Sequence, residues 1–432
     1  MLEIVGAARV DELFDAIPRS VHRDTPLELG PPMSEMELVR HLDELAAGNV
    51  GSGMPSFLGA GCAPHFVPSH VDALIQRQEY MTAYTPYQAE VGQGTLQSLY
   101  EFQSLVCMLT EMDVCNASVY DGASSVAEAV LMARRLRRRG GRVLFSEGLH
   151  PAYRTVAGTY ATHLDLEFEE LPVGEDGRTR LVDVGDDDVA VVVQQPNFFG
   201  VVEDLGPLAE AVGESAAKLV VATSEPLAFA LAIPPGRVGA DIVVGELRGF
   251  GNPMNFGGPL VGFMACRDRD KRNLPGRLVG ETVDLDGKRG YVLTLSTREQ
   301  HIRREKATSN ICTNEALAAL AACIHMCSLG RRGMRELAGV NLAKATYARR
   351  VLEDAGLEPL YGGPHFNEIT FRVPGGDADA LVAVCAAEGL LPGVALGRLD
   401  PAREDQLLVC ATEVHERADI DRLGSVVREA CR

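Results

Sequence analysis

Five short apolar segments, separated by helical stretches, constrain the fold of this 432-residue chain most strongly. They are VLF at 143–145, VAVVVQQ at 189–195, LVVAT at 219–223, DIVVGE at 241–246 and LVGFMA at 260–265. Nearly every position in them is apolar and many residues are β-branched, which is typical of strands buried on both faces. Helical segments near 124–138 and 204–217 alternate with the strands. The pattern therefore predicts a mostly parallel α/β sheet.

The chain is too long for one simple core, so we expect a large domain and a smaller one. Residues 1–50 are predicted to be a helical N-terminal segment, with a capping box that begins at Ser34. Residues 51–330 are predicted to form the large α/β domain, in which the stretch after Pro275 is rich in loops. Two helices are expected at 314–327 and 331–355. Residues 331–432, with strands EITFRV and LLVCAT, are predicted to form a small C-terminal α/β domain.

Charge and cysteine content exclude several classes of protein. Lys and Arg number 41 against 60 Asp and Glu, and a net charge of −19 disfavours a nucleic-acid binder. The ten cysteines include no CxxC pair, and the nearest approach, Cys323 and Cys327, lies in an apolar segment without further ligands, so we expect no metal site. The sequence has no basic N-terminal region before an apolar run, and no apolar segment long enough to span a bilayer. We therefore expect a cytoplasmic protein without a membrane partner.

A polar and aromatic loop precedes an amphipathic helix whose apolar stripe begins at Leu96. Thr85, Tyr87, Gln88 and Glu90 bring a hydroxyl, a phenol, an amide and a carboxylate together on a loop that Pro86 restrains. These groups can recognise a small zwitterion, since the amide and hydroxyl suit its carboxylate and the acid suits its ammonium. A surface turn with ordinary hydrogen bonds is an equally good interpretation of these residues.

A second loop, Asp121-Gly122-Ala123-Ser124-Ser125, leads into a helix. Gly122 permits close approach of a ligand, and the exposed N–H groups of the helix start can bind an anion such as phosphate. Ser125 and Glu128 also fit an ordinary capping box, so the pattern alone does not decide between the two.

The positions of the lysines decide which cofactor chemistry the chain can support. The Gly-rich turn after DIVVGE, GELRGFGNPMNFGGP at 245–259, resembles the region where pyridoxal-phosphate enzymes of the aspartate aminotransferase fold carry their Schiff-base lysine. The whole chain has five lysines, at 218, 271, 288, 306 and 344, and none lies in this turn. Because Schiff-base chemistry needs a positioned lysine amine, we expect no covalently bound cofactor.

Long motifs along nearly the whole chain resemble the alpha subunit (subunit 1) of the glycine cleavage system P-protein, glycine dehydrogenase (decarboxylating). They are FLGAG at 57–61, TAYTPYQAE at 82–90, QGTLQ at 93–97, EFQ at 101–103, NASVYDGAS at 116–124, HPAYR at 150–154, QQPNFFG at 194–200, GADIVVGE at 239–246, NFGGP at 255–259, PGRLVGETVD at 275–284 and REQHIRREKATSNIC at 298–312. Matches of this length and number are improbable by chance.

The resemblance implies a fold-type-I pyridoxal-phosphate transferase-like α/β architecture, similar to aspartate aminotransferase, with a large and a small domain. It implies a heterotetramer of two alpha and two beta subunits in which the beta subunit carries pyridoxal phosphate. The pair would decarboxylate glycine (EC 1.4.4.2) and pass the aminomethyl group to the lipoyl arm of the H-protein, and the isolated chain would be inactive. The resemblance implies three sets of site residues in this chain: His65, Tyr84, Thr85, Tyr87, Gln88 and Glu90 reaching the partner's active site; Asp121, Gly122, Ala123 and Ser124 as a relic phosphate turn; and Arg303, Lys306 and Asn310 near the lipoyl entrance.

Three departures from the family pattern keep other functions open. Ala63 and Pro64 stand where the family has a Tyr-Asp pair, Gly92 stands where it has serine, and LRGFGNPMN replaces a small polar run. A lost tyrosine near the substrate loop would enlarge the pocket. A divergent homologue acting on another small amino acid or acceptor, and a non-catalytic scaffold for a pyridoxal-phosphate-bearing partner, are therefore the alternatives.

Overall fold

The computed structural model describes residues 1–23, 25–81, 84–137, 140–181, 184–255 and 257–431. Thr82 and Ala83 of the TAYTPYQAE motif, and Phe256 of the Gly-rich turn, lie outside the described residues. The chain divides into two units, Met1–Gly53 and Met54–Arg432. Each unit is described by itself.

The first unit is a succession of short helices. They are α1 (Leu2–Val5), η1 (Val10–Phe14), η2 (Arg19–Val21), α2 (Glu35–Ala47) and η3 (Val50–Gly53), where η denotes a 3₁₀ helix. The predicted capping box is confirmed at the start of α2, because the Ser34 hydroxyl accepts from the Glu37 N–H and the Glu37 carboxylate accepts from the Ser34 N–H. These reciprocal bonds satisfy backbone donors that have no partner within the helix.

The second unit contains a seven-stranded mixed sheet in the order β1-β7-β6-β5-β4-β2-β3. Its strands are β1 (Val114–Cys115), β2 (Arg142–Ser146), β3 (Glu167–Leu171), β4 (Asp188–Gln194), β5 (Lys218–Thr223), β6 (Ile242–Glu246) and β7 (Gly262–Cys266). The five predicted apolar runs are confirmed as β2, β4, β5, β6 and β7. The neighbouring strands β3, β2, β4, β5 and β6 are parallel to one another, whereas β7 runs antiparallel to both β6 and β1.

Helices cover both faces of this sheet, which explains why its central strands are mostly apolar. Val191 and Val193 of β4 pack in one core with α5 (Gln93–Thr110), α8 (Leu205–Gly213) and the first half of α11 (Ala316–Ala355). The alternate residues, Ala190 and Val192, pack in a second core with α6 (Gly122–Arg137) and α7 (Pro151–Ala161). Successive side chains of a strand point to opposite faces, so a strand between two helical layers is apolar throughout.

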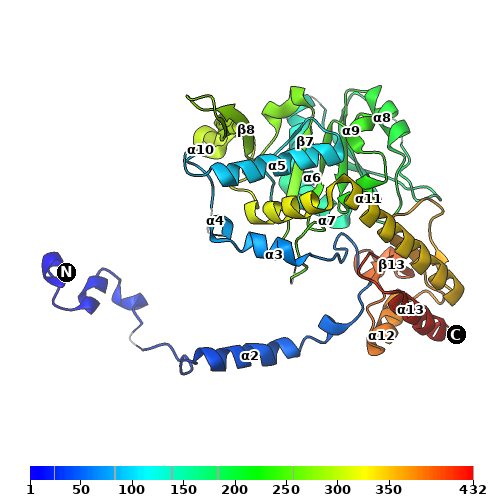
Figure 1. The fold of residues 1–432 in the computed structure, drawn as a ribbon, viewed down its shortest axis with the longest axis horizontal. Coiled ribbons are helices and arrows are strands. Elements are labelled where there is room, and N and C mark those ends of the chain that lie inside the picture. The colour runs from blue at the N-terminus through cyan, green and yellow to red at the C-terminus, as the bar shows by residue number, and fades with distance from the viewer. Residues whose placement is uncertain (24, 82–83, 138–139, 182–183, 256, 432) are drawn as a thin grey trace. The chain divides into compact units, whose positions relative to one another are not determined.

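A smaller antiparallel sheet follows near the C-terminus, in the order β10-β11-β13-β12. Its elements are β10 (Glu358–Pro359), β11 (Glu368–Arg372), α12 (Ala378–Ala387), β12 (Val394–Ala395), β13 (Gln406–Cys410) and α13 (Arg417–Ala430). Figure 1 shows α12 and α13 beside β13, at the far end of α11 from α5. The second half of α11 packs into this core through Ala345, Ala348 and Leu352. The predicted strands EITFRV and LLVCAT are thus confirmed as β11 and β13.

Two local predictions can be compared with the structure. The loop-rich stretch after Pro275 also contains a hairpin that was not predicted, because β8 (Leu278–Val283) pairs antiparallel with β9 (Arg289–Thr294). The two helices expected at 314–327 and 331–355 are confirmed as the two halves of α11, which are separated at Gly330, whose φ of 58° and ψ of −179° are not helical. A glycine adopts such a conformation without the steric cost of a Cβ. The domain boundary near residue 330 remains our proposal.

The remaining helices are short and connect the larger elements. They are α3 (Ser69–Ile75), α4 (Gln78–Met81), η4 (Pro226–Ala230), α9 (Pro235–Val238), η5 (Asp268–Asn273), η6 (Ser296–Arg298), α10 (Gln300–Arg303), η7 (Arg304–Lys306), η8 (Leu396–Arg398) and η9 (Pro401–Arg403). Within the described residues, no helix is both long enough and apolar enough to cross a membrane.

Candidate functional site

The polar and aromatic loop before α5 presents most of its side chains to solvent. Tyr84 and Tyr87 are 71% and 64% exposed, and Gln88 and Glu90 are exposed as well. Thr85 is half-buried, and its hydroxyl oxygen has no hydrogen-bond partner in the described part of the chain. Large aromatic side chains left in water on a loop commonly belong to a contact with another molecule. The side chains of this loop are therefore accessible from outside the chain.

Arg277, at the start of β8, ties this loop to the segment that precedes α11. Its Nη1 donates to Thr313 Oγ1 at 2.8 Å and to Asn314 Oδ1 at 3.1 Å. Its Nη2 donates to the Cys312 carbonyl at 3.2 Å and to the Tyr87 hydroxyl at 3.3 Å, and the guanidinium lies 5.5 Å from the Tyr87 ring centre. The arginine is only 5% exposed. A rigid, multidentate fork of this kind fixes the segments that it joins.

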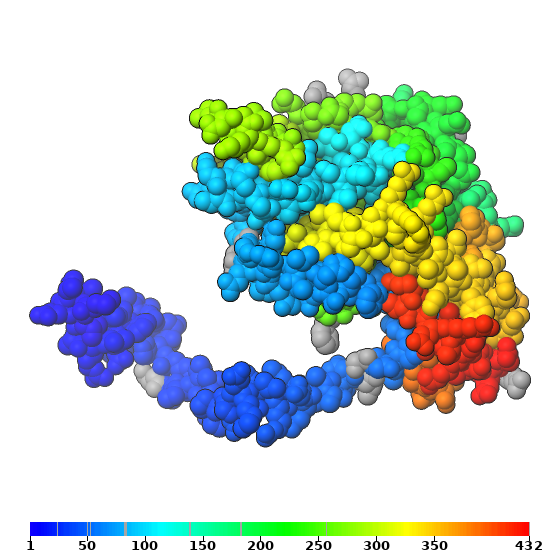
Figure 2. All heavy atoms as spheres, in the orientation of Figure 1, coloured from blue at the N-terminus to red at the C-terminus, as the bar shows by residue number. Residues whose placement is uncertain are grey.

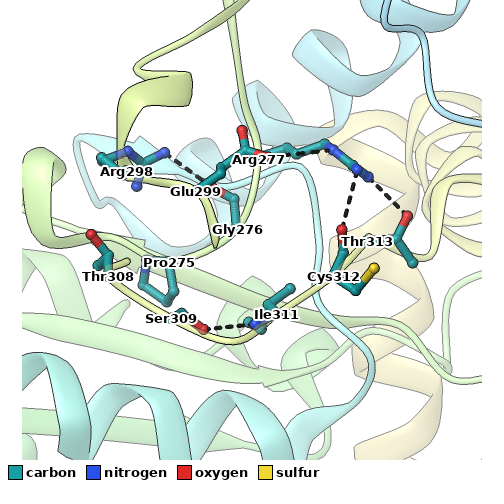
Figure 3. A pocket seen from close by; sticks show the side chains of 10 residues that line it. All are labelled: Pro275, Gly276, Arg277, Arg298, Glu299, Thr308, Ser309, Ile311, Cys312 and Thr313. Atoms are coloured by element: carbon teal, nitrogen blue, oxygen red, sulfur yellow. Dashed lines mark hydrogen bonds and ion pairs between the residues drawn. The ribbon is translucent and has the colours of Figure 1, made fainter. Parts of the chain in front are cut away.

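A small pocket lies beside this junction, and Figure 3 shows Arg277 reaching out of it toward Cys312 and Thr313. Arg298 lines the opposite side and donates to the Gly276 carbonyl at 3.0 Å. The pocket volume is about 20 Å³, which holds a water molecule but not an amino acid.

The segment between residues 309 and 315 crosses the start of α6. Ser309 Oγ donates to Glu128 Oε1 of α6 at 2.6 Å, and the Cys312 N–H donates to the Tyr120 hydroxyl at 2.8 Å. Burial raises the pKa of Glu128. The structure thus brings three predicted parts of the site together: the loop of Tyr87, the turn before α6 and the segment before α11.

Of the residues predicted near the lipoyl entrance, Asn310 lies in that segment, whereas Arg303 and Lys306 lie just before it, in α10 and η7. The side chains of Arg303, Lys306 and Asn310 are exposed, and Arg303 Nε donates to the Thr297 carbonyl at 3.2 Å. Their exposure leaves them accessible to another molecule.

The predicted anion turn adopts the geometry of a helix start. Asp121 Oδ1 accepts from the Ser124 N–H at 2.7 Å, and the Asp121 carbonyl accepts from the Ser125 N–H and hydroxyl. Gly122 begins α6 and Ala123 follows it, half-buried. Asp121, and not Ser125, therefore caps the helix, so the predicted capping box of Ser125 and Glu128 is wrong: Ser125 donates to the Asp121 carbonyl and Glu128 accepts from Ser309.

A carboxylate of the chain itself binds one N–H group of this turn. Glu246 Oε2 accepts from the Gly122 N–H at 3.2 Å, while Oε1 accepts from two N–H groups outside the turn, those of Val261 at 2.7 Å and Arg248 at 3.0 Å. Burial raises the pKa of Glu246 to about 7, although these three N–H groups favour the ionised carboxylate and by themselves would lower its pKa. Tyr153 also packs against Gly122, because a Cβ at this position would collide with the Tyr153 hydroxyl. Glu246 and Tyr153 therefore leave little free space around Gly122.

His65 does not lie with the exposed loop. Its buried ring bridges two acidic side chains, with Nε2 2.8 Å from Glu225 Oε2 and Nδ1 3.0 Å from Glu413 Oε2. Burial opposes the charged form, but Glu225 and then Glu413 raise the pKa of His65 to about 10. Glu413 follows β13 of the small sheet and Glu225 follows β5 of the large sheet. The imidazolium therefore joins the two sheets.

Among the described residues, no group of three or more His, Cys, Asp or Glu side chains could hold a metal ion.

A family model described as glycine cleavage system P-protein matches residues 1–427 of the chain. The chain belongs to the glycine cleavage system P-protein family. It is similar to the "Probable glycine dehydrogenase (decarboxylating) subunit 1" of Anaeromyxobacter dehalogenans, with 49% identity over 99% of this chain and 97% of that protein. The corresponding protein of Phenylobacterium zucineum is 50% identical over 98% and 96%.

Solved structures agree with this assignment. Glycine decarboxylase (P-protein) of the glycine cleavage system, in an inhibitor-bound form, matches with a TM-score of 0.93 and 42% identity over 100% of this chain and 97% of that chain. A sphingosine-1-phosphate lyase from Burkholderia pseudomallei matches with a TM-score of 0.67 and 17% identity over 94% and 92% of the two chains, which shows a shared fold only. The chain has the fold-type-I pyridoxal-phosphate transferase-like fold. It is subunit 1 of glycine dehydrogenase (decarboxylating), EC 1.4.4.2.

The P-protein family depends on pyridoxal phosphate, but the residues of this chain do not fit the cofactor. The Gly-rich turn at 245–259 contains no lysine. Arg248 in that turn is buried and donates to the Ala63 carbonyl at 3.1 Å. The Glu246 carboxylate accepts from the Gly122 N–H of the predicted anion turn, so a phosphate would have to compete with it for that donor.

Sequence reasoning missed the residues that organise this region: Arg277, Glu246, Arg248, Glu225 and Glu413. Arg277 lies in the motif PGRLVGETVD, which was noted for the family resemblance but not for its arginine. Its position directly before a strand was the available signal. The other four become partners only in the folded chain, so no spacing in the sequence indicates them.

Proposed function

We propose that this chain lends loop residues to an active site on subunit 2, and that subunit 2 carries the pyridoxal phosphate. The observation that carries the proposal is the Glu246 carboxylate on the Gly122 N–H of the predicted anion turn, in a chain whose Gly-rich turn lacks a lysine. The chain keeps an exposed set of polar groups on Tyr84, Tyr87 and Gln88, next to a turn whose Gly122 N–H it has already bonded itself. Such a chain is suited to complete a site across an interface.

The reaction that we propose for the pair is decarboxylation of glycine, with transfer of the aminomethyl group to the lipoyl arm of the H-protein. Tyr84, Thr85, Tyr87, Gln88 and Glu90 would face glycine, with amide and hydroxyl groups suited to its carboxylate and Glu90 suited to its ammonium. Because this loop is exposed, the partner surface would exclude water from it. We propose a structural role for His65, since its ring is buried between two acidic side chains.

Arg303, Lys306 and Asn310 would lie where the lipoyl arm enters. Their exposed segment is connected to Tyr87 through Arg277, which supports a path from the surface to the loop. We propose that two copies of each subunit form a heterotetramer. All ten cysteines are unpaired, which suits the reducing cytoplasm that we propose for the complex.

Isolated and paired chains are expected to differ in cofactor binding. The purified chain, incubated with pyridoxal phosphate, freed of unbound cofactor by dialysis and then reduced with borohydride, should show no stoichiometric added mass on any of its five lysines. With purified subunit 2 it should form a complex that absorbs as a pyridoxal-phosphate enzyme and, given oxidised lipoylated H-protein as acceptor of the aminomethyl group, releases labelled carbon dioxide from glycine. Reduction of the cofactor onto a lysine of the isolated chain would contradict the proposal.

Gln88→Ala is expected to lower glycine decarboxylation by the pair about tenfold or more, without weakening the complex, because on this proposal the exposed amide would hydrogen-bond the substrate. The matched control is Gln97→Ala on α5, whose amide donates to Glu101 of the same helix. Decarboxylation rates and the affinity for subunit 2 are measured for both variants. Full activity of the Gln88 variant would instead favour the scaffold alternative.

Most of the departures from the family pattern lie outside the loop of Tyr87. The Ala63 carbonyl accepts a hydrogen bond from the Arg248 side chain, which belongs to the divergent LRGFGNPMN segment. The Pro64 carbonyl accepts a hydrogen bond from the Thr412 hydroxyl. Gly92 is the exception, because a Cβ there would lie 2.9 Å from Cβ of Pro86 in the loop. Assaying the pair against glycine, alanine and serine tests whether this contact changes the substrate, and glycine is expected to be the preferred one.

A further inference from the structure

The N-terminal unit, Met1–Gly53, has no hydrophobic core of its own. None of its described side chains is buried, and it contains nearly half of the exposed large apolar residues in about an eighth of the chain. The P-protein family model matches from residue 1, so the segment belongs to the family fold. A soluble protein rarely leaves that much apolar surface in water unless another molecule covers it.

The helix α2 concentrates this apolar surface on one side. Residues spaced three and four apart form its apolar stripe: Leu38, Val39, Leu42 and Leu45, which are between 45% and 60% exposed. The other side of the helix is charged: Glu37, Arg40 and Glu44. Figure 2 shows that the segment is one helix thick here. A helix of 13 residues is marginal in water, so its amphipathic stripe needs a surface to pack on.

We propose that the apolar stripe of α2 docks on subunit 2, and that Met1–Gly53 is an arm that grips the partner. The proposal rests on the proposed function, because it takes subunit 2 as the partner. Charge disfavours a second copy of this chain: the segment has ten acidic and four basic residues, and the whole chain carries −19. Two such acidic surfaces repel each other. A different polypeptide is therefore the occupant that the charges allow.

The test uses two variants of the full-length chain that change the net charge equally. Leu38→Glu with Leu42→Glu places two carboxylates in the stripe, and Arg40→Glu makes the same change of two charges on the polar side of the same helix. The double variant is expected to bind purified subunit 2 at least about tenfold more weakly than the wild type, and the control within about twofold. Equal affinities of the double variant and the wild type would overturn the proposal.

Hydrogen exchange of the α2 amides identifies what covers the helix. We expect fast exchange in the isolated chain and slow exchange once subunit 2 is added. Slow exchange of the α2 amides without subunit 2 would overturn the proposal. If the slow exchange depended on protein concentration, a second copy of this chain would cover the helix. If it did not, the arm would pack on its own chain. An active complex with unprotected α2 would reject the arm but retain the proposed function, whereas wild-type chains that form no complex would reject the proposed function.

Discussion

Removing the imidazole of His65 is expected to lower the free energy of unfolding of this chain by about 3–5 kcal/mol. In His65→Ala, the carboxylates of Glu225 and Glu413 would remain buried without the cation between them. Asn341 and Asn367 donate to these carboxylates at 2.9 and 3.0 Å, but they are neutral and cannot replace the charge. The expected loss of unfolding free energy is large because two buried carboxylates are left without their shared cation. It is measured by urea unfolding at pH 6.5.

An exposed ion pair provides the control for this prediction. Arg332 and Glu336 lie one turn apart on α11, and both side chains are mostly exposed. Arg332→Ala is expected to change the unfolding free energy by less than about 0.5 kcal/mol. A His65→Ala chain as stable as this control would contradict the assignment of His65 as an ionised junction between the two sheets.

The pH dependence of stability is a second test of the junction formed by His65, Glu225 and Glu413. The pKa of His65 is about 10 in the folded chain, above the ordinary value of 6.5, so its contribution is complete below pH 6.5 and is lost as the pH rises through 10. The pKa of Glu413 is lowered to about 2 by His65, although burial opposes this, so its contribution is present above pH 4.5 and is lost toward pH 2. The difference in stability between wild type and His65→Ala should therefore shrink between pH 6.5 and 10, by at most about 1.4 kcal/mol per pH unit.

The main sheet could be predicted from the sequence because its strands are buried on both faces. A run such as VAVVVQQ has no amphipathic alternative, and it forms β4. The strand β3, Glu167–Leu171, escaped prediction because four of its five residues are exposed and three are glutamates, which disfavour strands. The hairpin of β8 and β9 was hidden by glycines and charges, since one of its faces is not buried continuously.

The candidate site divides in a similar way. The loop of Tyr87 and the turn of Asp121 could be located, because local residue types carry their chemistry. That Glu246 binds the turn could not be predicted, because Gly122 and Glu246 are separated by 124 positions and meet only when β6 passes the start of α6. The role of His65 was hidden for the same reason, because its partners come from two different sheets.

Arg277→Lys is expected to lower glycine decarboxylation by the pair of subunits about 100-fold, with little change in its assembly. The guanidinium spans Thr313 and Tyr87 with donors on two nitrogens, whereas an ammonium has all its donors on one atom and cannot reach both. Tyr87 would then lose its fixed position in the loop, and a displacement of about 1 Å is enough for an effect of this size. Turnover and the affinity for subunit 2 are measured together.

The neighbouring strand offers a matched control. Arg289 on β9 lies over the ring of Tyr291 at 5.8 Å but is exposed, so Arg289→Lys changes an arginine–tyrosine contact away from the loop and should alter turnover by less than about twofold. Combining Arg277→Lys with Tyr87→Phe separates a positioning role from a structural one. If Arg277 acts through Tyr87, the double variant should be no slower than the slower single variant, since both changes remove the same interaction. Independent, multiplying losses would show that Arg277 serves the segment before α11 instead, and that the Tyr87 loop holds its position without it.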